Sequence, residues 1–213
     1  MSTDHVAVQE KKIGRPTDVA KREAMLAAAS ASFFAHGFAA TSIEQVATDA
    51  AVSKVTVYNH FTDKNGLFAA AVERQCANLS GYFTIEQSHD GTLEDRFAQI
   101  GTAMGAFLSR PEMIQFERRI AAETEQNPEL GIAFLDAGPR RMKAQFSALL
   151  DRLVEEGALV IADTSLATEQ FVSMCKGMGD LERRFGAGVD AARDRERVAG
   201  AVAVFLKAYR PAL

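Results

Sequence analysis

The chain has 213 residues, 47% of them hydrophobic and 24% charged, which supplies enough apolar material for one large or two small globular domains. Its formal net charge of −4 argues against a protein that coats nucleic acid indiscriminately. No segment approaches the roughly 20 apolar residues that span a bilayer, and the beginning MSTDHVAVQEKK has no apolar export signal. We therefore expect a cytoplasmic protein with no membrane segment.

Residues 1–16 lack helical periodicity and are expected to form a flexible basic arm. Lys11, Lys12 and Arg15 lie in it, beside a glycine and a proline. Such an arm suits contact with the phosphates or the minor groove of DNA. The alternative is a solvated tail without a binding role, and the sequence leaves both open.

The stretch from Asp18 to His36 predicts a helix with a small-residue face. It is rich in alanine, and its larger apolar residues are Met25, Leu26, Phe33 and Phe34. Gly37 follows directly and is typical of a left-handed residue that caps a helix C-terminus.

Two short helical patterns, separated by only a few residues, lie in TSIEQVATDAAVSKVTVYNHFTDK, from Thr41 to Lys64. The first begins at Thr41, and Glu44 stands three positions later, which is the spacing of a capping box. Ser53 is the expected N-cap of a second helix that reaches to about Phe61.

The second of these helices has two unlike faces on a helical wheel. Val57 and Phe61 point towards a core. The opposite face has Val55, Tyr58 and Asn59 at its centre and Lys54 and Thr56 at its edges. Such a face suits a helix in the major groove of DNA, where side chains reach base edges and the flanks contact phosphates. The geometry alone fits an ordinary amphipathic helix pair equally well.

The residue string itself favours DNA. From the Gly-Arg-Pro arm to about Glu73, the chain resembles the DNA-binding domain of the tetracycline-repressor (TetR) family of bacterial transcription regulators. The most specific part is VSKVTVYNHFTDK, whose Ser, Lys, Thr, Tyr, His-Phe and Lys positions match the family. The resemblance implies a helix-turn-helix DNA-binding domain over residues 17–76 and a ligand-binding and dimerisation domain over residues 77–213.

The resemblance also implies which residues contact double-stranded DNA. They are Arg15, Thr41, Ser42, Ser53, Lys54, Val55, Thr56, Tyr58, Asn59, His60 and Lys64. The outward face of the second helix is expected to read bases, while Ser42, His60 and Lys64 fix the protein on the phosphate backbone. Asp63 is the expected cap of the helix that begins with Lys64.

Two positions depart from the family's pattern. Ala51 stands where many relatives have glycine, which costs strain if φ is positive there. Val55 replaces the small residue often found after Ser-Lys, and it is placed to pack on a thymine methyl group. These departures support a second hypothesis, in which the chain is a ligand-binding or protein-interaction module that has lost operator recognition.

The remaining chain stays helical while the resemblance weakens. A run from Thr92 is stopped by Pro111, which suits the first turn of the next helix; Asn127-Pro128 ends that one. A long helix, broken or kinked at Gly138-Pro139, is expected next, closed by Gly157. FERRIAAETEQNPELGIAFLDAGP is similar to the AefR-like regulators of the family.

Two further helices are expected, from Asp163 or Thr164 to about Phe185 and from about Val189 to Tyr209. No strand alternation or repeat is present in the sequence. The expected fold is therefore all-α, with about nine or ten helices.

Catalytic and metal-binding residue types are scattered. The four histidines form no HExxH motif, and Cys76 and Cys175 form no CxxC pair. There is neither a GxSxG elbow nor a P-loop. We expect no enzyme, no cofactor and no metal site.

A pocket for a small, often hydrophobic effector is implied in the second domain. The candidate lining residues are Met104, Phe107, Phe116, Phe134, Met142, Phe146 and Met174. Flexible methionines and aromatic rings suit such a pocket. The alternative is that these residues fill a core.

A single short recognition helix binds DNA weakly, so a two-fold homodimer on a palindromic operator is expected. The resemblance places the interface on the last two helices, and its candidate residues are Phe171, Leu181, Val198, Val202, Phe205 and Leu206. The alternative is that these helices close the protomer core. The favoured hypothesis is a repressor released by an effector, although the sequence identifies neither the effector nor the operator.

Overall fold

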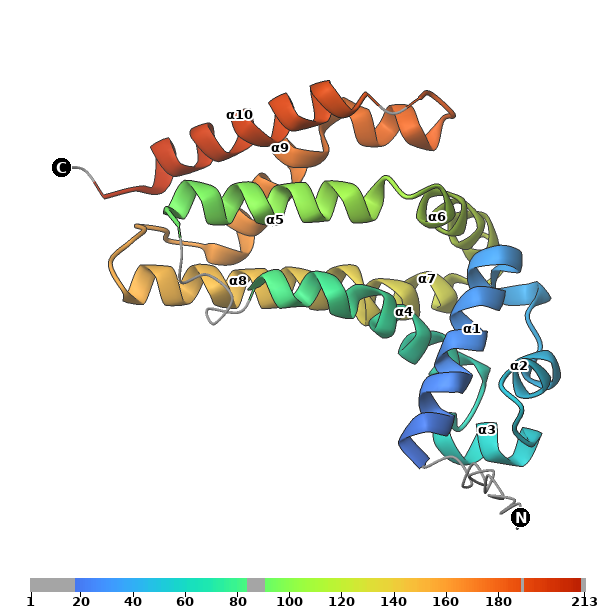
Figure 1. Cartoon of the computed structure of the whole chain (residues 1–213). Coiled ribbons are helices and arrows are strands. Elements are labelled where there is room, and N and C mark those ends of the chain that lie inside the picture. The colour runs from blue at the N-terminus through green and yellow to red at the C-terminus, as the bar shows by residue number, and fades with distance from the viewer. Residues whose placement is uncertain (1–17, 84–90, 189, 212–213) are drawn as a thin grey trace, which may run out of the picture.

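The computed structural model describes residues 18–83, 91–188 and 190–211. Over these residues the chain forms ten α-helices and one 3-10 turn, with no strand (Figure 1). The all-α prediction is confirmed. None of the described helices combines the length and hydropathy of a transmembrane span.

The first four helices form a block at one end of an elongated molecule and lead into its body (Figure 1). They are α1 (Asp18–Ala40), α2 (Ile43–Asp49), α3 (Lys54–Phe61) and α4 (Lys64–Ser80). Helix α4 is continuous past residue 76, where we expected the DNA-binding domain to end.

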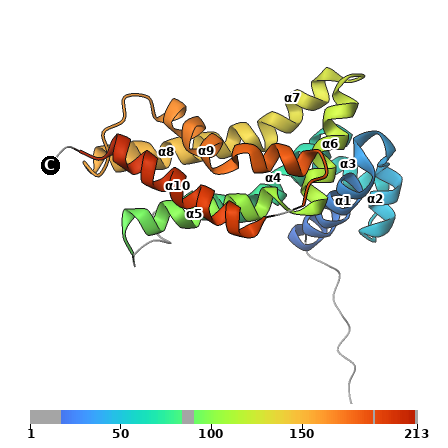
Figure 2. The ribbon, with the colours of Figure 1, turned by 90° about the horizontal axis from the view of Figure 1, so that it is seen from above.

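The second part of the chain forms the long body. After the 3-10 turn Gly81–Phe83, its helices are α5 (Leu93–Leu108), α6 (Pro111–Thr124), α7 (Pro128–Ala137), α8 (Pro139–Glu155), α9 (Thr164–Arg184) and α10 (Ala191–Tyr209). Viewed from above, α10 crosses over α9 and α5 (Figure 2). A proline occupies the first turn of α6, α7 and α8, where the missing N–H costs nothing.

Most helix starts follow from local capping. Ser53 and Asp63 accept backbone N–H groups at the starts of α3 and α4, as predicted. Thr92 forms a full capping box with Asp95 at the start of α5. The capping box predicted at Thr41 is wrong, because Ser42 is the N-cap of α2 and its side chain accepts the N–H of Gln45.

Two helices are interrupted by glycine. Gly37, predicted as a left-handed C-cap, has φ 86° and ψ 179°, and the chain regains helical geometry up to Ala40. The second interruption is at Gly177 within α9, with φ 46°, where we expected an unbroken helix.

The buried side chains form two cores. The first combines α1–α4 with residues of α6 and α7, including Met113, Phe116 and Ile120. The second joins α5, α8, α9 and α10 around Phe97 and Phe171, whose rings meet edge to face at 5.3 Å. Because α6 and α7 belong to the first core, the body is packed directly against the N-terminal block.

Candidate nucleic-acid interface and ligand cavity

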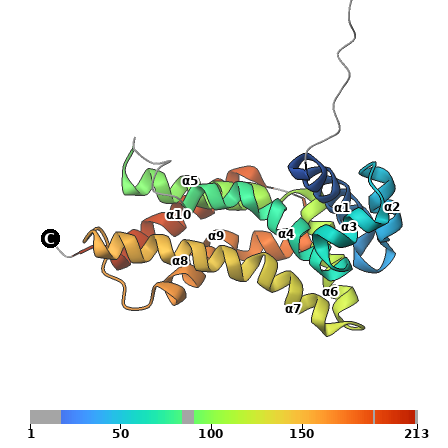
Figure 3. The ribbon, with the colours of Figure 1, turned by 90° about the horizontal axis from the view of Figure 1, so that it is seen from below.

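Helix α3 presents one face to solvent at the end of the molecule. It lies at the lower edge in Figure 1 and faces the viewer in Figure 3. Val55 is 67% exposed and Tyr58 is 43% exposed, whereas Val57 and Phe61 are buried in the first core. Asn59 is also exposed. The side chains predicted to read bases therefore share one open face, as the helical wheel indicates.

The base of α3 is fixed by its own cap and by α1. The Ser53 hydroxyl accepts the N–H of Thr56 at 3.1 Å and lies 2.8 Å from the Thr56 hydroxyl. On the buried side, the Arg22 guanidinium lies 5.4 Å from the centre of the Phe61 ring. The outward face is thus held on a rigid support.

Lys54 is engaged within the protein. Its ammonium group donates to the Glu44 carboxylate and lies 5.8 Å from the centre of the Tyr58 ring. This hydrogen bond lowers the pKa of Glu44 and raises the pKa of Lys54. Both groups are on the surface, so their ion pair contributes little free energy. A phosphate group can therefore take the place of the Glu44 carboxylate as the partner of Lys54 at little cost.

The turn between α2 and α3 forms despite its departure from the family pattern. Ala51 adopts φ 52°, the left-handed conformation for which relatives use glycine. Neither Ala51 nor the exposed Val55 disrupts the helix-turn-helix geometry. The two departures therefore leave the exposed face of α3 in place.

Four residues predicted to contact DNA form contacts within the N-terminal block itself. Thr41 is 3% exposed and donates its hydroxyl hydrogen to Gly37 O at 2.8 Å, so it is wrongly assigned to DNA. His60 is turned towards α1, with Nε2 3.2 Å from Asp18 Oδ1 and a side chain only 15% exposed. Ser42 and Ser53 are exposed, but their hydroxyl groups cap helices by accepting backbone N–H groups.

Lys64 is also directed inwards. Its Nζ donates to Ala39 O at 3.2 Å and lies 4.5 Å from the centre of the Phe38 ring. Burial lowers its pKa. Its side chain joins the start of α4 to the end of α1, and the expected phosphate contact stays a prediction. Arg15 lies outside the described residues.

A cavity of about 670 Å³ lies between the two cores. Its walls come from α1 and from α4 through α9 and are mostly aromatic or aliphatic. Six of the seven predicted lining residues meet there: Met104, Phe107, Phe116, Phe134, Met142 and Phe146. Met174 does not line it and packs against the second core instead. The size and the apolar lining are those of a small-molecule site.

The polar side chains of the cavity are mostly paired. Lys143 forms an ion pair with Glu169, and Arg184 contacts Glu117 at 2.8 Å. Burial raises the pKa of Glu117, although Arg184 opposes the rise. Cys76 also lines the cavity, and burial raises the pKa of its thiol to about 11, so it remains protonated and unreactive at neutral pH.

Helix α6 connects the cavity to the N-terminal block. On one side its Phe116 ring lines the cavity and stacks on Phe34 of α1, with centroids 4.1 Å apart. Elsewhere on α6, the Glu123 carboxylate accepts the N–H groups of Phe38 at 3.0 Å and Ala39 at 2.7 Å. Arg119 donates to Phe34 O.

These α6 contacts were not predicted from the sequence. Arg119 and Glu123 are about 85 residues from their partners, and no local motif marks them. They join the end of α1 to a helix that forms part of the cavity wall.

Both parts of the chain match known family models. Residues 25–71 match the model described as "Bacterial regulatory proteins, tetR family". Residues 95–211, more than half of the chain, match "AefR-like transcriptional repressor, C-terminal domain". The chain belongs to the TetR family. Its TetR-type and AefR-like parts are those that the resemblance implied, and the family comprises transcription regulators rather than enzymes.

Solved structures of TetR-family proteins share the whole fold. A TetR-family transcriptional regulator from Mesorhizobium loti MAFF303099 is 28% identical, with a TM-score of 0.75 over 92% of this chain and 100% of that one. The "Flavonoid-responsive Regulator FrrA" is 25% identical, with a TM-score of 0.70 over 91% of this chain and 98% of that one.

A curated relative matches over a shorter range. The HTH-type transcriptional repressor ComR of Escherichia coli (strain K12) is 34% identical over 105 residues, which are 47% of this chain and 50% of that protein. This chain therefore matches about half the length of that relative.

The residues predicted for the dimer interface of this TetR-family chain need correction. Five of them, Phe171, Val198, Val202, Phe205 and Leu206, are at most 7% exposed because they fill the protomer's own second core. Only Leu181 is open, at 47%. The exposed apolar residues near it in sequence or on α10 are Met178, Phe185 and Val204.

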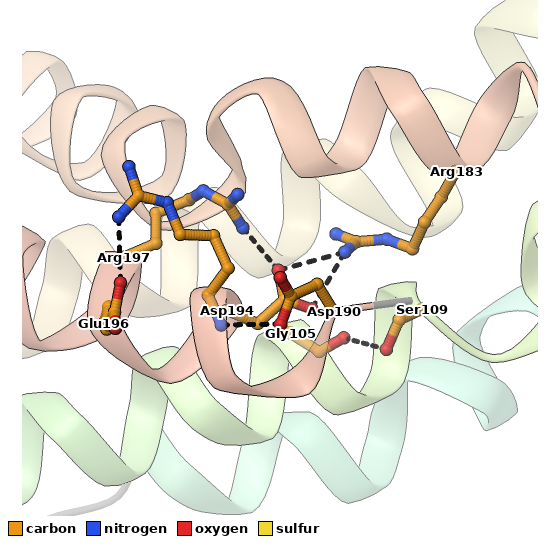
Figure 4. Close-up of polar contacts among 8 residues, drawn as sticks. Gly105, Ser109, Arg183, Asp190, Asp194, Glu196 and Arg197 are labelled. Atoms are coloured by element: carbon orange, nitrogen blue, oxygen red, sulfur yellow. Dashed lines mark hydrogen bonds and ion pairs between the residues drawn. The ribbon is translucent and has the colours of Figure 1, made fainter. Parts of the chain in front are cut away.

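A partly buried ion cluster joins α9 and α10 (Figure 4). Arg183 donates to Asp194 at 2.9 Å and 3.1 Å, and Arg197 donates to the same carboxylate. The interruption of α9 makes room for Arg197, because a Cβ atom on Gly177 would lie 2.7 Å from Arg197 Cδ. Gly177 thus has a packing role that accounts for its strained φ.

Proposed function

We propose that this TetR-family chain is a transcription repressor that binds a palindromic operator as a homodimer and is released by a small molecule. The observation that carries the proposal is the open face of α3, where Val55, Tyr58 and Asn59 project from a helix whose opposite side is buried. Such a helix inserts into the major groove. A regulator of this kind acts in the cytoplasm, where bacterial DNA lies.

Release follows from the double role of α6. A molecule in the cavity presses on Phe116, and the stacked Phe34 ring carries the displacement into α1. The Glu123 contacts to the end of α1 shift with it. An effector that prefers the shifted arrangement lowers the population able to place α3 on DNA. The effector is mostly apolar, with at least one aromatic ring, since phenylalanine is the commonest residue type in the lining. The name of the flavonoid-responsive relative is in keeping with this class.

The direct test is selection from a pool of random-sequence DNA duplexes with the purified protein. We expect enrichment of an inverted repeat whose half-site centres are about one helical turn, roughly 34 Å, apart. Enrichment of no sequence over the starting pool contradicts operator recognition. Enrichment of a single unrepeated site contradicts binding as a symmetric dimer.

The dimer surface is tested separately by Leu181→Asp. We place Leu181, Met178, Phe185 and Val204 at the two-fold interface, because they are apolar and exposed on α9, just after it and on α10. A carboxylate there is buried in each copy of the repeated contact, so the dissociation constant is expected to rise about tenfold or more. Sedimentation velocity measures the change.

Ile132→Asp on α7 is the matched control, because Ile132 is 53% exposed and lies outside the proposed interface. It should leave the dimer intact. Equal dissociation of both variants, or of neither, contradicts the proposed interface.

A further inference from the structure

A second hollow adjoins the cavity where α1, α4 and the first turn of α6 meet. This groove has a volume of about 490 Å³. Its floor is the small-residue face of α1, and its walls carry Arg74 and Gln75 of α4 and Arg110 and Gln115 at α6. The groove is therefore polar and cationic where the cavity is apolar.

The groove and the cavity are neighbours. Phe34 and Gln75 line both of them. Arg110 stands at the junction: its guanidinium lies 4.6 Å from the centre of the Phe107 ring, and Phe107 faces the cavity. One molecule can therefore place an apolar body in the cavity and a polar head in the groove.

Two buried polar atoms in the groove have no hydrogen-bond partner in the described part of the chain. Ser30 is 3% exposed, and its Oγ is unpaired. Arg110 Nη2 is likewise buried and unpaired, although Arg110 Nε donates to Phe107 O at 3.3 Å. Buried donors are nearly always satisfied in folded proteins, so two in one groove indicate a missing acceptor.

The charges around the groove favour an anion as that acceptor. Arg74 Nε contacts Glu23 at 3.3 Å, and Arg110 Nε lies 3.7 Å from the half-exposed Glu112, the carboxylate in the groove wall. Neither carboxylate reaches Arg110 Nη2. Helix α6, which begins here, has no side-chain cap, so its positive dipole end adds to the field. The cavity cations Lys143 and Arg184 are instead paired with carboxylates.

We propose that the effector is an amphipathic anion, with an aromatic body in the cavity and a carboxylate or sulfonate held by Arg110 and Ser30. This assignment rests on the cavity being the effector site proposed above. The two oxygens of a carboxylate, or two of the three oxygens of a sulfonate, match the fork of a guanidinium group, and the Ser30 hydroxyl supplies one further donor. An anion bound here touches α1, α4 and α6 together, which are the helices that join the cavity to the N-terminal block.

Two fluorescent probes of nearly equal shape separate the groove from the cavity. 8-Anilinonaphthalene-1-sulfonate carries the anionic head, and N-phenyl-1-naphthylamine is the same ring system without it. The wild-type chain should bind the sulfonate more tightly. Arg110→Met should weaken the sulfonate about tenfold or more, because a charge-assisted hydrogen bond is lost, and change the neutral probe less than about twofold.

Two control variants separate loss of the anion site from a general loss of binding. Arg140→Met removes an exposed arginine that lines neither the groove nor the cavity, and it should bind both probes like the wild type. Arg110→Lys keeps the charge and should retain part of the sulfonate affinity; it also serves if Arg110→Met does not fold. Sulfonate binding unchanged in Arg110→Met, or an equal loss of both probes, overturns the anion site while the cavity stands. Failure of both probes to bind the wild-type chain overturns the cavity as effector site and the anion site with it.

Discussion

Gly37→Ala is expected to lower the free energy of unfolding by roughly 3 kcal/mol. With φ 86° and ψ 179°, Gly37 lies in a backbone region that only glycine occupies without strain. A Cβ atom there would also lie 2.2 Å from Glu123 Oε1. The carboxylate must then move from the N–H groups of Phe38 and Ala39, and two charge-assisted hydrogen bonds are lost.

Urea unfolding followed by far-UV circular dichroism measures this loss. Gly105→Ala is the matched control, because Gly105 lies in helix α5 and a Cβ atom there meets nothing within 4 Å. That variant should gain up to about 1 kcal/mol, since alanine favours a helix interior over glycine. Similar unfolding midpoints for the two variants would show that the junction between α1 and α6 does not depend on Gly37.

Val55→Glu is expected to reduce affinity for the selected operator by about 100-fold or more, while the fold is unchanged. Val55 is 67% exposed at the centre of the α3 face, so the longer side chain fits without repacking. In the complex it places a carboxylate between two phosphate backbones and against base edges. Fluorescence anisotropy with a labelled operator, at one fixed salt concentration, measures the change.

Val160→Glu controls for the added charge. Val160 is 64% exposed in the segment between α8 and α9, at the opposite end of the molecule from α3. It should bind the operator within about twofold of the wild type, because a distant surface charge is screened by salt. If both substitutions weakened operator affinity equally, the effect would come from net charge. The result would then contradict a direct contact of α3 with the operator.

Helix positions were accessible from the sequence because local chemistry determines them. Ser53, Asp63 and Thr92 each cap a helix through their own side chains, and prolines mark the starts of α6, α7 and α8. The exposed face of α3 followed from a helical wheel for the same reason. Each of these features depends on residues within one or two turns.

The misassigned residues depend on distant parts of the chain. His60 meets Asp18, and Lys64 meets Ala39, so tertiary contacts engage both side chains within the N-terminal block. The prediction of the dimer-interface residues was wrong for a related reason. An apolar stripe on α9 or α10 packs equally well on its own protomer or on a partner. The burial of Phe171 and Phe205 in the second core shows that this stripe packs on its own protomer.

The cavity, too, was only partly predictable from the sequence. Apolar residues on several helices could be identified as candidates, but which of them surround open space depends on how the helices cross. Phe107 and Met142 face the cavity, whereas Met174 packs elsewhere. The groove beside Arg110 had no sequence signal, because α1, α4 and α6 contribute to it jointly.

The most direct test of the central claim, that α3 reads operator DNA in the major groove, is methylation interference on the selected operator. Dimethyl sulfate modifies guanine N7 in the major groove and adenine N3 in the minor groove, so one reagent reports protein contacts in both grooves. If α3 lies in the major groove, guanine methylation should block binding in two clusters about one helical turn apart. Interference only from adenine N3, or from neither base, would contradict it.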